Sequence, residues 1–219
     1  MTFTLIPAAD TSLPPLLFLP GWGFDGRLVS LFSLFPGRSL IVPRQWIDPF
    51  AAAAMLPELL RRQAAPVTVV GWSMGAQLGL ELALAHPELV ASLTLVAMRR
   101  IWPADEIAQI KGELAADPVL FMRGFYRKCF LGYRAAYQRF AEMLEEEYLR
   151  GCDVALLAAG LNYLAGFRLA GDPVVTVPLS VLHGGRDVVA PVGDMVRLPG
   201  MTGEIVPHGG HLVLLDRWR

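Results

Sequence analysis

The pentapeptide Gly71-Trp72-Ser73-Met74-Gly75 is the segment of this 219-residue chain best suited to chemistry. It follows the apolar, β-branched run 67–70 and opens an apolar stretch at helical spacing. A sharp strand-to-helix turn exposes a serine hydroxyl at the positive end of the helix dipole, and glycine on either side lets the two backbone segments pass closely. The pattern predicts a nucleophilic Ser73. A glycine-rich turn without a catalytic role is the alternative.

A serine hydroxyl is a weak nucleophile unless a base takes its proton and an acid orients that base. Of the four histidines, His211 is the expected base, because it directly precedes the apolar stretch 212–215, which we expect to form the last helix. His208 lies in the same glycine-rich loop and is the alternative base. His86 stands before a proline at an expected helix end, and His183 ends an apolar strand. We interpret both as structural.

Asp187 is the expected acid, because it follows a buried strand and a Gly-Gly turn, where a carboxylate can project from the carboxyl end of the strand. An Asp that caps the next helix is the alternative reading, and Asp194 is a weaker candidate for the acid. The chain order Ser73, Asp187, His211 is the order of the α/β-hydrolase triad and differs from the orders of the two unrelated serine protease folds.

A transition state that builds charge on a carbonyl oxygen needs N–H groups already aimed at that oxygen. The backbone N–H of Met74, directly after the serine, is one expected donor. The second is expected from the loop after an early strand, where Trp22 lies in Leu19-Pro20-Gly21-Trp22-Gly23. The indole of Trp22 can line the substrate pocket or simply pack.

Short apolar segments alternate with helical ones, which predicts an α/β protein with a mostly parallel, doubly wound sheet. The expected strands are 3–6, 16–19, 39–42, 67–70, 93–97, 174–182 and 204–206, and the expected helices include 28–35 and 49–62. Between residues 100 and 168 only helical periodicity appears. We therefore expect a core of residues 1–99 and 169–219 with a helical insertion, residues 100–168, here called the lid, over the site.

Composition narrows the function classes. A formal net charge of −1 gives no electrostatic reason to expect nucleic acid or an anionic membrane as a partner. No apolar stretch reaches about 20 residues, the length that spans a bilayer, and no signal peptide pattern is present. Cys129 and Cys152 show no metal-ligand spacing and are expected to be reduced thiols. We expect a cytoplasmic monomer without a metal or organic cofactor.

Taken together, these residues resemble the α/β-hydrolase superfamily, and within it most closely the pimeloyl-[acyl-carrier protein] methyl ester esterases of biotin synthesis. The likeness includes the loop 19–23, the serine pentapeptide, Gly160-Leu161-x-x-Leu164, and the segments bearing Asp187 and His211. The resemblance implies a serine carboxylesterase for a methyl or short-alkyl ester of a medium acyl chain that is bound to a carrier protein. Alternatives are a generic esterase or thioesterase, a C–C bond hydrolase, a perhydrolase and a non-catalytic binding protein.

The same resemblance implies that basic lid residues dock an acidic acyl-carrier protein. Arg123, Arg127 and Lys128 are the candidates, because the nearest acidic residue in the sequence is Asp117. A solvated face of mixed charge is the alternative, since the lid also carries many glutamates. Phe125 and Tyr126 are expected to line an acyl tunnel, although ordinary lid packing explains them equally well.

Overall fold

The computed structural model describes residues 2–8, 13–169 and 171–218. Within these ranges the core is a seven-stranded sheet with the order β1-β3-β2-β4-β5-β6-β7. Strand β1 is antiparallel to β3, and all other neighbours are parallel. This is the mostly parallel, doubly wound arrangement that the sequence predicts. The strands are β1 (Phe3–Ile6), β2 (Leu16–Leu19), β3 (Leu40–Pro43), β4 (Val67–Trp72), β5 (Val90–Val96), β6 (Leu179–Gly184) and β7 (Thr202–Val206).

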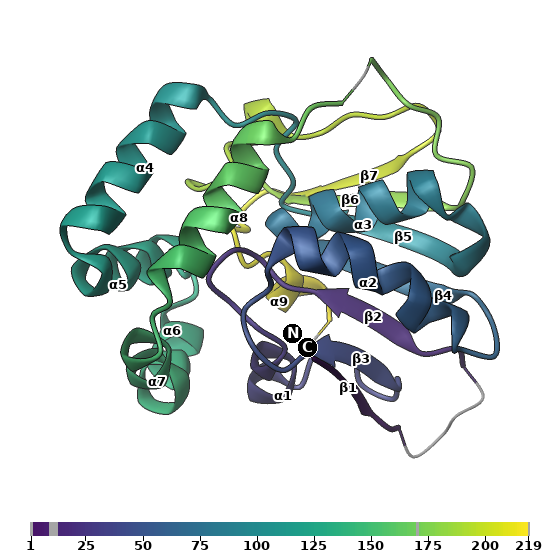
Figure 1. Cartoon of the computed structure of the whole chain (residues 1–219), viewed down its shortest axis with the longest axis horizontal. Coiled ribbons are helices and arrows are strands. Elements are labelled where there is room, and N and C mark those ends of the chain that lie inside the picture. The colour runs from purple at the N-terminus through teal and green to yellow at the C-terminus, as the bar shows by residue number, and fades with distance from the viewer. Residues whose placement is uncertain (1, 9–12, 170, 219) are drawn as a thin grey trace.

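Helices cover both faces of this sheet. Helices α2 and α3 lie on one face, and α1 and α9 lie on the other, where the Phe35 N–H that follows α1 donates to the Trp218 carbonyl that follows α9 (Figure 1). Because helices shield both faces, the central strands are apolar throughout: all four residues of β2 are buried. The core helices are α1 (Arg27–Phe32), α2 (Pro49–Arg61), α3 (Met74–Ala85) and α9 (Leu214–Arg217).

The sixth strand is shorter than expected. The sequence predicts a strand over 174–182, but β6 begins only at Leu179. Pro178 directly precedes it, and a proline has no N–H to donate to a ladder, although its carbonyl still accepts from Leu93. The apolar run 174–177 therefore leads into the sheet without joining it.

The chain between β5 and β6 forms helices gathered at one end of the sheet, the end toward which β2 points (Figure 1). Asp117 and Asp153 cap two of these helices by accepting the Leu120 and Leu156 N–H groups. No helix among the described residues is both long and apolar enough to cross a membrane. The lid helices are α4 (Ala104–Ala116), α5 (Pro118–Cys129), α6 (Arg134–Phe140), α7 (Glu146–Arg150) and α8 (Val154–Gly166), with a π-helical turn (Ala141–Glu145) joining α6 to α7.

Candidate active site

Ser73 lies at the sharp turn between β4 and α3. Its φ of 56° and ψ of −117° fall in a sparsely populated region for a residue with a side chain. The flanking glycines are necessary for this turn: a Cβ on Gly71 would lie 2.3 Å from the Gly75 carbonyl oxygen, and one on Gly75 would lie 2.0 Å from that of Leu19. Backbone strain of this kind costs on the order of 1–3 kcal/mol and persists where the surrounding structure enforces it. Here the glycines and the packed strands β2 and β4 enforce it.

His211 and Asp187 form a buried hydrogen-bonded pair at the same end of the sheet. Asp187 follows β6 and His211 follows β7, and the His211 Nδ1 lies 2.8 Å from the Asp187 Oδ2. The other carboxylate oxygen, Oδ1, accepts the N–H groups of Val189 and Ala190, both at 2.8 Å. Burial alone would raise the pKa of Asp187, but the attraction and hydrogen bond of His211 together with these two N–H donors hold it below its ordinary value. The carboxylate is therefore fixed in its charged form.

The two loops that carry Asp187 and His211 pass each other closely. A Cβ on Gly184 would lie 2.3 Å from the Gly210 carbonyl oxygen, so only glycine permits this approach. The Arg186 N–H donates to the Gly209 carbonyl at 2.8 Å across the same contact. His208 is exposed, and the part of the chain that the structure describes offers it no hydrogen bond. Of the two histidines in the loop, the geometry favours His211.

Two backbone N–H groups lie where the sequence places oxyanion donors. Met74 is the first residue of α3, and Trp22 lies in the turn after β2, which is closed by the Phe24 N–H donating to the Gly21 carbonyl at 3.1 Å. Neither the Met74 nor the Trp22 N–H donates to a carbonyl among the described residues. Unpaired donors at a helix N-terminus and in a tight turn are available to a developing negative charge.

The indole of Trp22 joins this turn to the lid. Its Nε1–H donates to the Leu157 carbonyl at 2.9 Å, and its ring packs edge-on against Phe125 at 4.9 Å between centroids. Helix α8 comes this close because residue 160 is glycine: a Cβ there would lie 2.5 Å from the Trp22 Cδ1. Gly160 belongs to the motif that the resemblance singled out, and its contact gives that motif a physical reason.

A cavity of about 660 Å³ opens between the serine and the lid. That volume falls within the range typical of small-molecule sites, about 300–1,000 Å³. Its wall is mainly apolar and aromatic, and its charged members are Glu106, Glu113, Asp117 and Lys128. The apolar wall includes Trp22, Trp102, Phe121, Phe125, Leu161 and Val189.

The structure corrects the expectation for Tyr126. Phe125 lines the cavity, but Tyr126 is fully buried on the other side of α5 and donates its hydroxyl hydrogen to the Gly23 carbonyl at 3.1 Å. The cavity is lined by positions 120, 121, 124, 125 and 128 of α5, and at about 100° per residue Tyr126 lies beyond that side of the helix. Tyr126 therefore contacts the loop that bears Trp22.

The basic residues of the lid differ in how free their charges are. Arg123 forms a 2.8 Å ion pair with Glu146. Because Glu146 lies 23 residues further along the chain, comparing Arg123 with its sequence neighbours does not reveal this partner. Arg127 is exposed and donates to the Tyr137 hydroxyl at 3.2 Å. Lys128 lines the cavity, and its ammonium group makes no ion pair within the described ranges. The absence of a close acidic residue in the sequence therefore does not leave the charge of Arg123 unpaired.

His183 and the two cysteines are not among the residues that line the cavity. His183 is fully buried at the end of β6, with its Nε2 2.8 Å from the Ala190 carbonyl oxygen. Cys129 and Cys152 are free thiols, the first buried and the second half-buried. Across the described residues, no three His, Cys, Asp or Glu side chains gather in an arrangement that could hold a metal ion.

Two features of the site were missed from the sequence. The Trp72 indole donates to the His211 carbonyl at 2.9 Å, and a buried Asp25 accepts from Tyr148 at 2.7 Å. The sequence does indicate that Asp25 needs a distant partner, because Asp25 and Arg27 are the only charged residues between Leu13 and Phe35. A carboxylate in such an apolar stretch requires partners that the local sequence does not supply.

Comparison with known proteins gives one family match. The model of the alpha/beta hydrolase family matches residues 16–219. A pimeloyl-[acyl-carrier protein] methyl ester esterase of Nitrosomonas europaea is 29% identical, over 93% of this chain and 90% of the relative. A protein of the same name from Aromatoleum aromaticum is 28% identical, over 82% of each chain.

Solved structures show the same fold at lower identity. The enol-lactonase from Burkholderia xenovorans superposes with a TM-score of 0.76 at 14% identity, over 99% of this chain and 91% of that one. A bromoperoxidase from Bacillus anthracis gives 0.75 at 15% identity, over 98% and 90%. Likeness at this level establishes architecture alone.

Proposed function

The chain belongs to the alpha/beta hydrolase family, and from that premise we propose that it is a serine carboxylesterase with Ser73, Asp187 and His211 as its catalytic residues. The observation that carries the proposal is the buried His211–Asp187 hydrogen bond at 2.8 Å, beside a strained serine turn that borders the cavity. A fixed imidazole, a half-buried serine hydroxyl that borders the cavity and a largely apolar pocket are the parts that acyl transfer needs.

The reaction proceeds in two halves. The Ser73 Oγ attacks the ester carbonyl carbon while the His211 Nε2 takes its proton, and the Met74 and Trp22 N–H groups stabilise the oxyanion. Collapse of this intermediate breaks the bond to the alcohol oxygen, which leaves with the proton from His211. Water then attacks the acyl-enzyme, His211 takes the proton of the water, and collapse releases the acid and returns the proton to Ser73.

Asp187 keeps the base ready for both halves. Its charged carboxylate accepts the Nδ1–H of His211, which leaves the Nε2 free to accept a proton, and it stabilises the imidazolium that forms. The two N–H donors at its other oxygen hold the carboxylate in place.

The preferred substrate is a methyl or short-alkyl ester of a medium-length acyl chain carried on an acyl-carrier protein. Support comes from the largely apolar cavity and from the names of the relatives from Nitrosomonas europaea and Aromatoleum aromaticum. Lys128 at the cavity and Arg127 beside it offer positive charge to an acidic partner. Arg123 offers less, because Glu146 neutralises it.

The substrate proposal is tested with pimeloyl methyl ester on acyl-carrier protein and with free dimethyl pimelate. We expect a higher kcat/KM for the carrier-bound ester, and we expect Arg127→Glu with Lys128→Glu to lower that value more than the value for the free diester. Arg61→Glu is the matched control, since Arg61 ends α2 just before β4 begins, at the end of the sheet opposite to the lid. Equal losses on both substrates would contradict carrier docking, and so would an equal loss in the control.

A further inference from the structure

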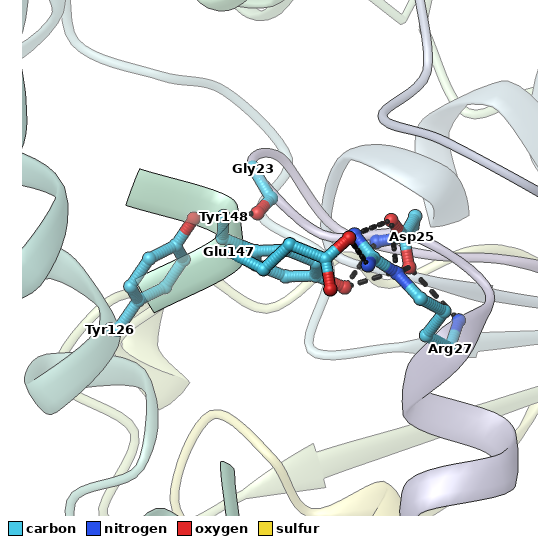
Figure 2. Close-up of polar contacts among 6 residues, drawn as sticks. All are labelled: Gly23, Asp25, Arg27, Tyr126, Glu147 and Tyr148. Atoms are coloured by element: carbon cyan, nitrogen blue, oxygen red, sulfur yellow. Dashed lines mark hydrogen bonds and ion pairs between the residues drawn. The ribbon is translucent and has the colours of Figure 1, made fainter. Parts of the chain in front are cut away.

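The loop between β2 and α1 carries Trp22, and three lid helices hold it. Beyond the Trp22 indole bond to α8, the Tyr126 hydroxyl of α5 donates to the Gly23 carbonyl at 3.1 Å. The Tyr148 hydroxyl of α7 donates to the Asp25 Oδ1 at 2.7 Å (Figure 2). Among the described residues, every hydrogen bond between residues 22–25 and the chain outside the segment 20–28 is made with the lid.

Asp25 is the charged centre of this contact. It is fully buried, and Arg27 pairs with it through Nε at 3.1 Å and Nη2 at 2.9 Å. The same guanidinium lies over the Tyr148 ring, 4.6 Å from its centroid, and reaches Glu147 on the lid (Figure 2). Removing a carboxylate from water is costly unless it is paired and hydrogen-bonded, so Asp25 requires both Arg27 and Tyr148. The loop and the lid are thereby fixed to each other.

The two tyrosines keep the protons that these bonds need. Burial, followed by nearby negative groups that include Asp25, raises the pKa of both Tyr126 and Tyr148. Each hydroxyl therefore stays protonated, and able to donate, at a pH where an ordinary tyrosine has begun to ionise. Their rings also pack together with Phe24 and Phe140. A Tyr→Phe change keeps this packing and deletes only the hydrogen bond.

We propose that Tyr126 and Tyr148 are positioning residues that hold the Trp22 N–H in place for the oxyanion, so that the lid is a fixed part of the catalytic machinery. This inference rests on the proposed esterase function. An N–H group stabilises an oxyanion only at hydrogen-bond distance, and small misplacements of catalytic groups reduce rates strongly. Among the described residues, the hydrogen bond that the core gives to this loop lies at its far side, where the Gly26 N–H donates to the Pro43 carbonyl at 2.9 Å, and the Phe24 ring packs on Trp72 of β4 at 4.9 Å between centroids.

The test compares Tyr126→Phe and Tyr148→Phe with Tyr163→Phe. Tyr163 is a matched control, because its hydroxyl also joins the lid to the core, donating to Glu81 Oε2 at 2.7 Å, but it contacts α3 and not the loop. With p-nitrophenyl butyrate we expect each loop variant to lower kcat about tenfold with KM within about twofold, since the lost stabilisation applies to the charged transition state. For the control Tyr163→Phe we expect both kcat and KM to stay within about twofold of the wild-type values.

Two further measurements separate this proposal from the esterase proposal. The affinity of a trifluoromethyl ketone, whose adduct carries an oxyanion, should fall in parallel with kcat/KM in the loop variants only. Amide hydrogen exchange over residues 20–27 should be faster in Tyr148→Phe than in Tyr163→Phe. This measurement does not depend on whether the protein hydrolyses esters. A folded wild-type protein whose Ser73 does not react with a fluorophosphonate would contradict the esterase proposal. Equal kcat losses in loop and control variants, or unchanged exchange over 20–27, would overturn the positioning role.

Discussion

The indole Nε1–H of Trp72 donates to the backbone carbonyl of His211 at 2.9 Å, and the two rings lie 5.3 Å apart between centroids. Trp72 directly precedes Ser73 and is fully buried. This single contact fixes the loop that bears the base to the strand that bears the nucleophile, across 139 positions of sequence. The spacing between serine and histidine therefore depends on the residue before the serine.

Trp72→Phe should keep most of the packing and lose this hydrogen bond. Because a neutral hydrogen bond contributes about 0.5–1.5 kcal/mol, we expect kcat to fall up to about tenfold, with a small change in KM. Steady-state kinetics on p-nitrophenyl butyrate measures both. Trp218→Phe, at the far face of the sheet against Phe35, is the control. A Trp72→Phe enzyme with wild-type kcat would contradict the positioning role of the indole.

Gly160→Ala should disturb the contact between the lid and Trp22. Alanine favours a helix by about 1 kcal/mol over glycine, but overlap with the indole is expected to cost about 1–3 kcal/mol. We therefore expect a lower free energy of unfolding and lower activity. Gly166→Ala in the same helix is the control, because a Cβ there meets nothing within 4 Å. Urea unfolding should show the first variant less stable than the second, and the reverse order would refute the contact.

Asp187→Asn should abolish most of the activity while leaving the fold intact. An amide in place of the carboxylate holds the imidazole in the wrong tautomer and no longer stabilises its cation, which costs on the order of 10⁴-fold in kcat in a triad. Single-turnover hydrolysis with circular dichroism as a folding check measures this. Asp194→Asn is the control, since Asp194 instead pairs with Arg99 at 2.8 Å. A larger loss of kcat in Asp194→Asn than in Asp187→Asn would show that Asp194, and not Asp187, is the acid of the triad.

His183 should make the folded protein sensitive to mild acid. Burial lowers its pKa from 6.5, against the opposing effects of the Ala190 hydrogen bond and the Asp187 and Asp194 charges, while the neighbouring His211 lowers it further. Its Nδ1 is buried without a partner among the described residues, so a proton added there would have no acceptor. As the pH falls, the histidine is protonated in the unfolded chain at a higher pH than in the folded protein. The free energy of unfolding therefore has its full value above about pH 6.5 and decreases as the pH falls below it.

The replacement His183→Gln keeps a donor for Ala190 and removes the titration. We expect its melting temperature to depend less on pH between 7.5 and 5.5 than that of wild type, and His208→Gln, at an exposed position, to behave like wild type. Differential scanning calorimetry across this range makes the comparison. Identical pH slopes for wild type and His183→Gln would show that this histidine is not the sensitive group.

Local chemistry made the turn and the strands predictable. Glycines flanking Ser73 have one physical reason to be there, and buried parallel strands are recognisable as short apolar runs. The predicted bounds of β1 and β2 agree with the structure, whereas the predicted start of β6 failed at Pro178. Tyr126 was misplaced because periodicity did not say which side of α5 faces the cavity. That choice depends on the loop at Gly23, more than 100 residues earlier.

Contacts between distant segments were not predictable from one sequence. The Glu146 partner of Arg123 and the Tyr148 partner of Asp25 belong to a part of the lid whose orientation is set by packing. The charges of these residues could be read from the sequence, but their pairing could not. The same limit explains why Trp72 was assigned no role.

The most direct test is hydrolysis of p-nitrophenyl acetate, butyrate and octanoate by wild type and Ser73→Ala, with mass spectrometry of the fluorophosphonate adduct. The account predicts ester hydrolysis by wild type, its loss in Ser73→Ala, and a single adduct on the peptide that contains Ser73. The chain-length profile then measures how far the acyl chain extends into the cavity. Activity that survives in Ser73→Ala, or an adduct located elsewhere, would contradict the serine mechanism.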